Sequence, residues 1–255
     1  MKVCVLASGS KGNVTYIETD KTKSLIDAGM SCKYIETKLK EIDVNPSDIE
    51  RIFITHAHSD HINGLRVFLK KYNPEVYLTE KMEEETNLII DKVCYIDGDI
   101  EIADLIIRPI KTSHDAADSQ GYVFINDDKS LMYMTDTGYI NVKNYNKLKD
   151  HDMYILESNH DIEMLMNGKY PYHLKQRILG DKGHLSNKDS AYYLSEFTTD
   201  KTKKVILAHL SENNNTPEKA LDAYHKAYKK ANKKEPKVEV ARQQEKTEVI
   251  KVWLK

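Results

Sequence analysis

Cysteine is scarce in this chain, and that scarcity excludes two common kinds of site. The three cysteines, Cys4, Cys32 and Cys94, are odd in number and widely spaced. We therefore expect neither a disulfide framework nor a thiolate zinc site, and a reducing cytoplasm is the expected compartment. The opening residues, MKVCVLASGSKGN, turn polar too soon for a secretory signal peptide. No run of about 18 apolar residues is present, so we expect no membrane-spanning helix.

A charge excess is also missing. The 38 basic and 40 acidic residues leave a formal net charge of −2. The overall basic charge of many nucleic-acid binders is therefore absent, although a local basic strip could serve the same purpose. Tryptophan occurs once, and the 16 tyrosines are spread along the chain, so the aromatic residues predict no cofactor-binding motif.

What the sequence does contain is many short apolar segments. The 255 residues, 40% of them hydrophobic, suffice for one sizeable core, and we expect a single domain over residues 1–255. Strands are predicted for KVCVLAS, NVTYIET, KSLIDAG, RIFIT, EVYLT, YIDGDIEIADLIIRPIKTSH, GYVFIN, SLMYMTDTG, DMYILESNH, KKVILAHLS and VEVARQQEKTEVIKVW. Helices are predicted for SCKYIETKLKEI with Ser31 as N-cap, INGLRVFLKKY, EKMEEETNLI, NKDSAYYLSEF and TPEKALDAYHKAYKKANKK. Strands interleaved with helices in two similar halves predict an α/β fold, a four-layer αββα sandwich with its site along one edge.

One stretch, IFITHAHSDHINGL, concentrates metal-binding side chains. His56 and His58 are two residues apart and point the same way on an extended segment. Asp60 and His61 follow at once and can turn toward a second position. Imidazole and carboxylate groups suit zinc, manganese or iron. Four ligands this close, split in pairs, predict two metal ions a few ångströms apart.

The hexad His-x-His-x-Asp-His after an apolar strand resembles the metallo-β-lactamase superfamily. That resemblance implies the αββα sandwich and three further ligands, each following an apolar strand: His114 in IKTSHDA, Asp136 in MYMTDTG and His209 in VILAHLS. One divalent ion would take His56, His58 and His114. The other would take Asp60, His61 and His209, with Asp136 bridging the two. The sequence leaves zinc and manganese open, because imidazole-rich sets accept both.

Other segments narrow the resemblance. KGHLSN places His184 at an expected helix start, a natural anion site, and resembles the segment that contacts the scissile phosphate in phosphodiesterases such as tRNase Z. With ASGSKGN, ESNHD, YPYHLKQRILGDKGHLSN and AHLSENNN it makes the chain similar, nearly end to end, to the YycJ family, also called WalJ or VicX. That family is associated with bacterial 5′-to-3′ exonuclease activity on DNA.

Some branches of the superfamily fit less well. Too few residues separate Asp136 from His209 for the cap domain of the β-CASP nucleases. Too few separate His114 from Asp136 for the tRNA-gripping arm of typical tRNase Z, so we expect neither a cap domain nor an exosite arm. A flavodiiron oxidoreductase would usually carry glutamate where this chain has His58.

The resemblance implies a hydrolytic mechanism on a phosphodiester. A hydroxide bridging the two metals would attack, Asp60 would orient it, and His184 would contact the phosphate and protonate the leaving oxygen. Substrate contacts are expected from Arg177 and Lys175, although a solvated loop explains those two residues equally well. Four further residues are expected either to support a ligand or to line the cleft: Ser10, Asn13, Asn159 and His160.

The substrate is expected to be DNA, with RNA as an open alternative. Two other functions also fit the sequence. A small-molecule phosphodiesterase, for example one acting on cyclic phosphates, would use the same metals and a closed pocket instead of a basic groove. A metal-binding regulatory module without turnover is the third reading, although Asp60, Asp136 and His184 are all present. Oligomeric state and the direction of digestion do not follow from the residues themselves.

Overall fold

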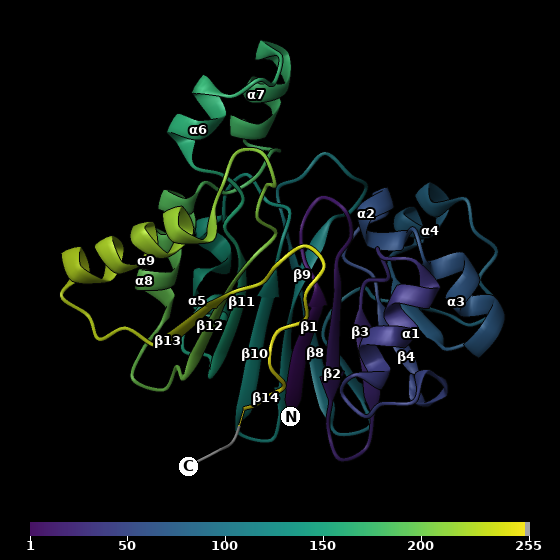
Figure 1. Ribbon diagram of the computed structural model, residues 1–255. Helices are drawn as coiled ribbons and strands as arrows, with labels where there is room; N and C mark the ends of the chain where they lie inside the picture. Colours follow the sequence, from purple (N-terminus) through teal and green to yellow (C-terminus); the bar gives the residue numbers. More distant parts are fainter. Residues whose placement is uncertain (253–255) are drawn as a thin grey trace.

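The computed structural model describes residues 1–252, and its strands form two seven-stranded sheets (Figure 1). The first sheet has the strand order β14-β1-β2-β3-β4-β5-β6. Its strands are β1 Lys2–Ala7, β2 Val14–Glu18, β3 Lys23–Ile26, β4 Arg51–Phe53, β5 Glu75–Leu78, β6 Val93–Tyr95 and β14 Ile250–Lys251. Strands β3 to β6 run parallel to one another.

The second sheet has the order β13-β12-β11-β10-β9-β8-β7. Its strands are β7 Ile100–Ile102, β8 Leu105–Lys111, β9 Gln120–Asn126, β10 Lys129–Met134, β11 Met153–Glu157, β12 Lys204–Ala208 and β13 Lys237–Val240. Strands β10 to β13 are parallel, and β9 lies antiparallel to both β8 and β10. Consequently β8, β10, β11 and β12 all end at the same edge of the sheet.

Helices cover the two outer faces of the sheets (Figure 1). The helices on the first sheet are α1 Cys32–Lys40, α3 Leu65–Tyr72 and α4 Glu80–Thr86, and those on the second are α5 Tyr145–Leu148, α8 Asn187–Phe197 and α9 Pro217–Ala231. The remaining helices are α2 Ser59–Ile62, α6 Ile162–Asn167, α7 Tyr172–Leu179 and the 3-10 turns η1 Pro46–Asp48 and η2 Val142–Asn144. Figure 1 shows α6 and α7 standing above the upper edge of the sandwich. No helix within residues 1–252 has the length and apolar character needed to cross a lipid bilayer.

Three apolar layers hold the four structural layers together. Alternate residues of each strand point to opposite faces, so Val3 and Val5 of β1 enter the layer between the sheets while Cys4 and Leu6 pack under the helices. Phe53 lies fully buried in the central layer, against Phe124 of the facing sheet at a ring-centroid distance of 5.3 Å. Truncating such a side chain to alanine typically costs about 3–5 kcal/mol of stability. The predicted αββα sandwich is confirmed.

The structure also differs from the predicted elements at four places. Residues 172–179 form α7, which was not predicted. The helix predicted from Ile62 begins only at Leu65, as α3, because Ile62 is the last residue of α2 and Gly64 lies between the two helices, where a Cβ atom would lie 2.0 Å from the Met30 carbonyl oxygen. The prediction that His184 opens a helix is wrong, because α8 begins at Asn187 with Ser186 as its N-cap. The last predicted strand is present only as β13 and β14, and its Trp253 lies outside the described residues.

Candidate metal centre

The loop after β4 presents the four candidate ligands of the hexad. His58 has extended backbone, and the ring centroids of His56 and His58 are 4.6 Å apart. At Ser59 the chain turns into the short helix α2, which brings Asp60 and His61 back toward the same side, and the His61 N–H donates to the His58 carbonyl oxygen at 2.9 Å. The Asp60 backbone packs directly on Gly29, where a Cβ atom would lie 1.7 Å from the Asp60 oxygen.

Asp27, at the end of β3, fixes this loop from behind. Its fully buried carboxylate accepts the Thr55 N–H at 2.8 Å and lies 2.9 Å from the Thr55 hydroxyl. His61 Nδ1 donates to Asp27 Oδ2 at 2.8 Å, so His61 Nε2 faces the opposite way, toward Asp136. Burial lowers the pKa of His61, but Asp27 and Asp136 together raise it well above its usual value. Asp27 was not predicted as a functional residue, because its only signal in the sequence is an acidic residue directly after the apolar strand KSLI.

The second sheet supplies its candidate ligands one strand end at a time. His114 follows β8, Asp136 follows β10 and His209 follows β12. Asp136 and His209 both adopt left-handed backbone, with φ of +58° and +54°. Such conformations are uncommon for residues other than glycine and concentrate at functional sites. Asp136 Oδ2 lies 3.1 Å from His61 Nε2 and 3.2 Å from His209 Nδ1, so the two halves of the molecule meet at this carboxylate.

Several ligand atoms in this cluster are buried without hydrogen bonds. Within residues 1–252 these atoms are His56 Nε2, Asp136 Oδ2 and His209 Nδ1. Buried polar atoms normally have partners, and leaving them without one costs free energy. The side chains of the cluster form four groups whose ligand atoms lie within 4.8 Å of one another: His56 with His58 and His114, Asp60 with His61 and His209, His56 with His61 and Asp136, and Asp136 with Glu157, His184 and His209. The imidazole and carboxylate donors and their convergence fit divalent metal ions.

The candidate ligands differ in their protonation preferences. Burial raises the pKa of Asp136, but His209 and His61 outweigh it and hold that pKa well below its usual value. Burial lowers the pKa of His56 well below normal and also lowers that of His114. Burial likewise lowers the pKa of His209, yet the Asp136 carboxylate raises it to about 9. Asp136 is therefore anionic and the His56 and His114 imidazoles are neutral, which are the forms that bind metals. His61 and His209 are held protonated by the buried carboxylates, so each must release a proton when a cation binds.

His184 lies at the edge of the cluster and is held by Glu157. Its Nδ1 donates to Glu157 Oε1 at 2.8 Å, and the other carboxylate oxygen accepts the N–H groups of Leu185 at 3.0 Å and Thr137 at 3.1 Å. Burial lowers the pKa of His184, but the Glu157 carboxylate raises it above its usual value overall. The Glu157 side chain is fully buried at the end of β11, and this residue was also missed in the sequence, where it reads as the last letter of MYILE.

Two asparagines predicted to lie near the site contact candidate ligands. Asn13 Nδ2 lies 3.0 Å from His61 Nε2 and donates to Asp60 Oδ2 at 3.4 Å. The side chain of Asn159 donates to the His209 carbonyl oxygen at 3.0 Å, so it fixes the backbone of that residue. Ser10 is exposed on the turn between β1 and β2. Ser8, which the sequence did not single out, accepts the His209 N–H at 2.8 Å.

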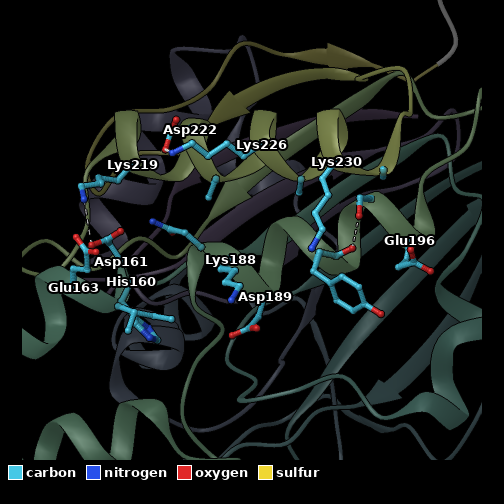
Figure 2. Close-up of a pocket in the computed structure, with 17 residues that line it drawn as sticks. His160, Asp161, Glu163, Lys188, Asp189, Glu196, Lys219, Asp222, Lys226 and Lys230 are labelled. Carbon is cyan, nitrogen blue, oxygen red and sulfur yellow. Dashed lines mark hydrogen bonds and ion pairs between the residues drawn. The ribbon is translucent and has the colours of Figure 1, made fainter.

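His160 is buried but lies apart from the ligand cluster. It is 1% exposed, and neither ring nitrogen has a hydrogen-bond partner within the described residues. Burial lowers its pKa to about 4. Figure 2 shows His160 at one end of a cavity of about 770 Å³ between α8 and α9. Lysines and carboxylates alternate along the rest of that cavity, and Lys219 pairs with Asp161 at 3.4 Å.

The two basic residues predicted to meet substrate lie on α7 and make contacts within the protein. Arg177 Nε pairs with Asp115 Oδ2 at 2.6 Å, directly after the candidate ligand His114. Lys175 donates to the carbonyl oxygens of Met166 at 2.6 Å and Gly168 at 2.8 Å, which ties α7 to the end of α6. Their role as substrate contacts stays a prediction.

The chain is similar in sequence to known proteins. Residues 7–157 match the family model described as metallo-beta-lactamase superfamily. The chain is 42% identical over 223 residues to exodeoxyribonuclease YycJ of Bacillus anthracis, which covers 85% of this chain and 84% of the relative. It is 43% identical over 228 residues to exodeoxyribonuclease WalJ of Streptococcus pneumoniae, with 86% and 85% covered.

Solved structures agree on the fold. The metallo-beta-lactamase fold protein YhfI from Bacillus subtilis has a TM-score of 0.71 at 14% identity, covering 96% of this chain and 98% of that one. A diphosphatase from the PhnP family has a TM-score of 0.64 at 19% identity, covering 97% and 98%. At these identities the likeness shows the fold alone.

Proposed function

The chain belongs to the YycJ/WalJ family of the metallo-beta-lactamase superfamily, and from that membership we propose that it is a metal-dependent exonuclease acting on DNA in the 5′-to-3′ direction. The observation that carries the proposal is the His184–Glu157 pair beside the cluster of ligand atoms. Such a pair can supply the proton that the leaving oxygen of a phosphodiester takes up. We also propose a cytoplasmic location, for which the three free cysteines are the support.

Seven side chains are proposed to hold two divalent ions, zinc or manganese. The first ion would be held by His56, His58 and His114, and the second by Asp60, His61 and His209, with Asp136 between them. Bound there, the ions would lower the pKa of a water molecule toward neutrality and offset negative charge on the phosphodiester. The grouping is supported by the ligand atoms that lie within 4.8 Å of one another in both sets.

His184 is proposed to be the general acid. Its Nδ1 is occupied by Glu157, which leaves Nε2 free to face the substrate. The buried carboxylate raises the pKa of the imidazole, so the ring carries a proton at a higher pH than usual. A positioned acid of this kind typically contributes about 10²–10⁴-fold in rate.

Asp60 is proposed to orient the attacking water. Its carboxylate is partly exposed, lies 3.5 Å from His61 Nε2 and accepts from Asn13. Burial raises the pKa of Asp60, but its contact with His61 lowers it below the usual value overall. The carboxylate is therefore ionised at neutral pH and able to accept a hydrogen bond or a proton from water.

The decisive experiment is cleavage of end-labelled single-stranded DNA and RNA with zinc or manganese, alongside bis-p-nitrophenyl phosphate. The protein is compared with its Asp60→Ala and His184→Ala variants. Progressive shortening of DNA from the 5′ end, strongly reduced in both variants, is the expected result. Hydrolysis of the small diester without polymer cleavage would favour a small-molecule phosphodiesterase. Bound metal without turnover of any substrate would favour a regulatory module.

A further inference from the structure

A second cavity opens beside the candidate metal centre. Its volume is about 520 Å³, within the range of about 300–1,000 Å³ that is common for ligand sites. The walls come from the segment after β8, the loop after β10, η2 and Lys182. His114 belongs both to this wall and to the proposed ligand set. Whatever occupies this cavity therefore lies next to the proposed metal centre.

The charge of this cavity suits phosphate. Three lysines line it, Lys111, Lys143 and Lys182, against one carboxylate, Asp118. Asp118 also lies 3.7 Å from Lys81 and 3.5 Å from Lys111, so its charge is shared between two cations. Within residues 1–252, Lys143 and Lys182 form no ion pair.

In the cavity between α8 and α9, carboxylates outnumber lysines. It is lined by four lysines and by five carboxylates, and Lys226 pairs with Asp222 at 2.6 Å (Figure 2). A polyanion binds where basic side chains are in excess and free to exchange their counterions. The two cavities thus differ in net charge, and the cavity beside His114 is the better site for a negatively charged nucleic-acid strand.

An exposed aromatic ring completes the cavity. Tyr139 is 40% exposed, while its backbone carbonyl is held by the Thr137 hydroxyl at 2.7 Å. The neighbouring Gly138 N–H donates to the Ser113 carbonyl oxygen at 2.9 Å, which links this loop to the residue before His114. The backbone is therefore fixed while the ring stays accessible. Aromatic rings of this kind stack on nucleobases irrespective of sequence.

From these observations we propose that the cavity beside His114 binds the nucleotide next to the scissile phosphate of a single DNA strand. The side chains of Lys143 and Lys182, with Lys111 at the rim, contact backbone phosphates, and the ring of Tyr139 stacks on the base. The inference rests on the proposed nuclease function and adds to it the path of the strand.

Charge reversal tests the lysines. Lys143→Glu and Lys182→Glu are compared with Lys230→Glu from the other cavity and Lys40→Glu from the far end of α1. We expect Lys143→Glu and Lys182→Glu each to raise the KM for single-stranded DNA by about tenfold. Each is also expected to reduce the slope of the logarithm of the binding constant against the logarithm of salt concentration by about one. Their loss of kcat/KM on DNA is expected to exceed their loss on bis-p-nitrophenyl phosphate by about the same factor.

Two results would overturn the inference without touching the proposed function. One is a KM for DNA that is the same in Lys143→Glu and Lys182→Glu as in the unmodified protein. The other is an equal rise in KM for Lys230→Glu or Lys40→Glu, because the effect would then come from overall charge. Absence of DNA cleavage by the unmodified protein would instead contradict the proposed function itself.

Tyr139 gives an independent test. Tyr139→Ala is expected to raise the KM for DNA by about tenfold through lost stacking, whereas Tyr139→Phe keeps the ring and is expected to restore binding. With an oligonucleotide that is abasic at its 5′-terminal nucleotides, the difference between Tyr139→Ala and Tyr139→Phe is expected to disappear. A persistent difference on the abasic strand would refute stacking.

Discussion

The two halves of the molecule contribute to the candidate metal centre in different ways. The first sheet delivers four candidate ligands on one stretch of six residues after β4, between His56 and His61. The second sheet delivers His114, Asp136 and His209 singly, each from the end of a different strand. A single short loop can therefore be read as a metal motif, whereas the dispersed ligands become a site only through the parallel order of the strands.

Each half also contains one fully buried carboxylate that accepts backbone N–H groups and the Nδ1 proton of a histidine. Asp27 holds His61 in the first half, and Glu157 holds His184 in the second. The histidines then differ. The other nitrogen of His61 faces the ligand cluster, whereas the His184 side chain is 18% exposed at the edge of the site. We therefore expect the first carboxylate to govern metal affinity and the second to govern proton transfer.

Removing the charge at the meeting point of the two halves is expected to have the largest effect. Asp136→Asn keeps the shape of the side chain, and asparagine tolerates the left-handed backbone at this position. We expect kcat to fall by about 10³-fold and one metal ion to be lost, because the anionic oxygen between His61 and His209 is gone. Metal analysis and single-turnover cleavage check this. Full metal content with full activity would contradict a bridging role.

His184→Ala is expected to come next. Loss of the acid lowers kcat by about 10²-fold or more, while metal content stays that of the unmodified protein. A substrate with an activated leaving group, such as bis-p-nitrophenyl phosphate, needs less protonation and is expected to lose less activity. Metal loss in this variant would instead make His184 a ligand.

Asp27→Asn separates metal affinity from chemistry. The variant replaces the charged acceptor of His61 Nδ1 with a neutral amide, and carboxylate partners of this kind are typically worth about 10–100-fold in metal affinity. We expect activity to recover when the manganese or zinc concentration is raised. Activity that stays low at saturating metal would place Asp27 outside metal binding.

Glu157→Gln is expected to have the smallest effect at the pH optimum and a clear effect on the pH profile. Because Glu157 raises the pKa of His184, the protonated acid persists to higher pH and activity is lost as pH rises through that pKa. In the variant the pKa falls, so the loss begins at lower pH. Added metal is not expected to reverse it, in contrast to Asp27→Asn. An unchanged basic limb would show that the carboxylate does not tune His184.

Much of this arrangement was predictable from the sequence, for reasons specific to each residue. The hexad was readable because its ligands are adjacent, and His114, Asp136 and His209 because each follows an apolar strand and matches the superfamily. The structure brings all of them together, although their binding of metal stays a proposal. Two of the supporting side chains, Asp27 and Glu157, were not predicted. A carboxylate at the end of an apolar strand looks like a turn residue, and the partners of these two lie 34 and 27 positions further along the chain.

The errors near His184 have a similar origin. The sequence around it predicted a helix start, whereas Asn187 is the first helical residue and Ser186 caps it. His184 is instead placed by its backbone N–H, which donates to the Ile178 carbonyl oxygen at 3.0 Å, and by Glu157. Neither contact is visible in the hydrophobic periodicity of the sequence. Ile178 lies in α7, which was not predicted, and Glu157 lies at the end of β11.

The most direct test of the central claim is a count of the metal ions bound per chain. Calorimetric titration of metal-free protein with manganese, followed by elemental analysis, would be applied to the unmodified protein and to His56→Ala and His209→Ala. We expect two ions for the unmodified protein and one for each variant, because His56 and His209 belong to the ligand sets of different ions. A single ion in the unmodified protein, or two ions retained in both variants, would contradict it.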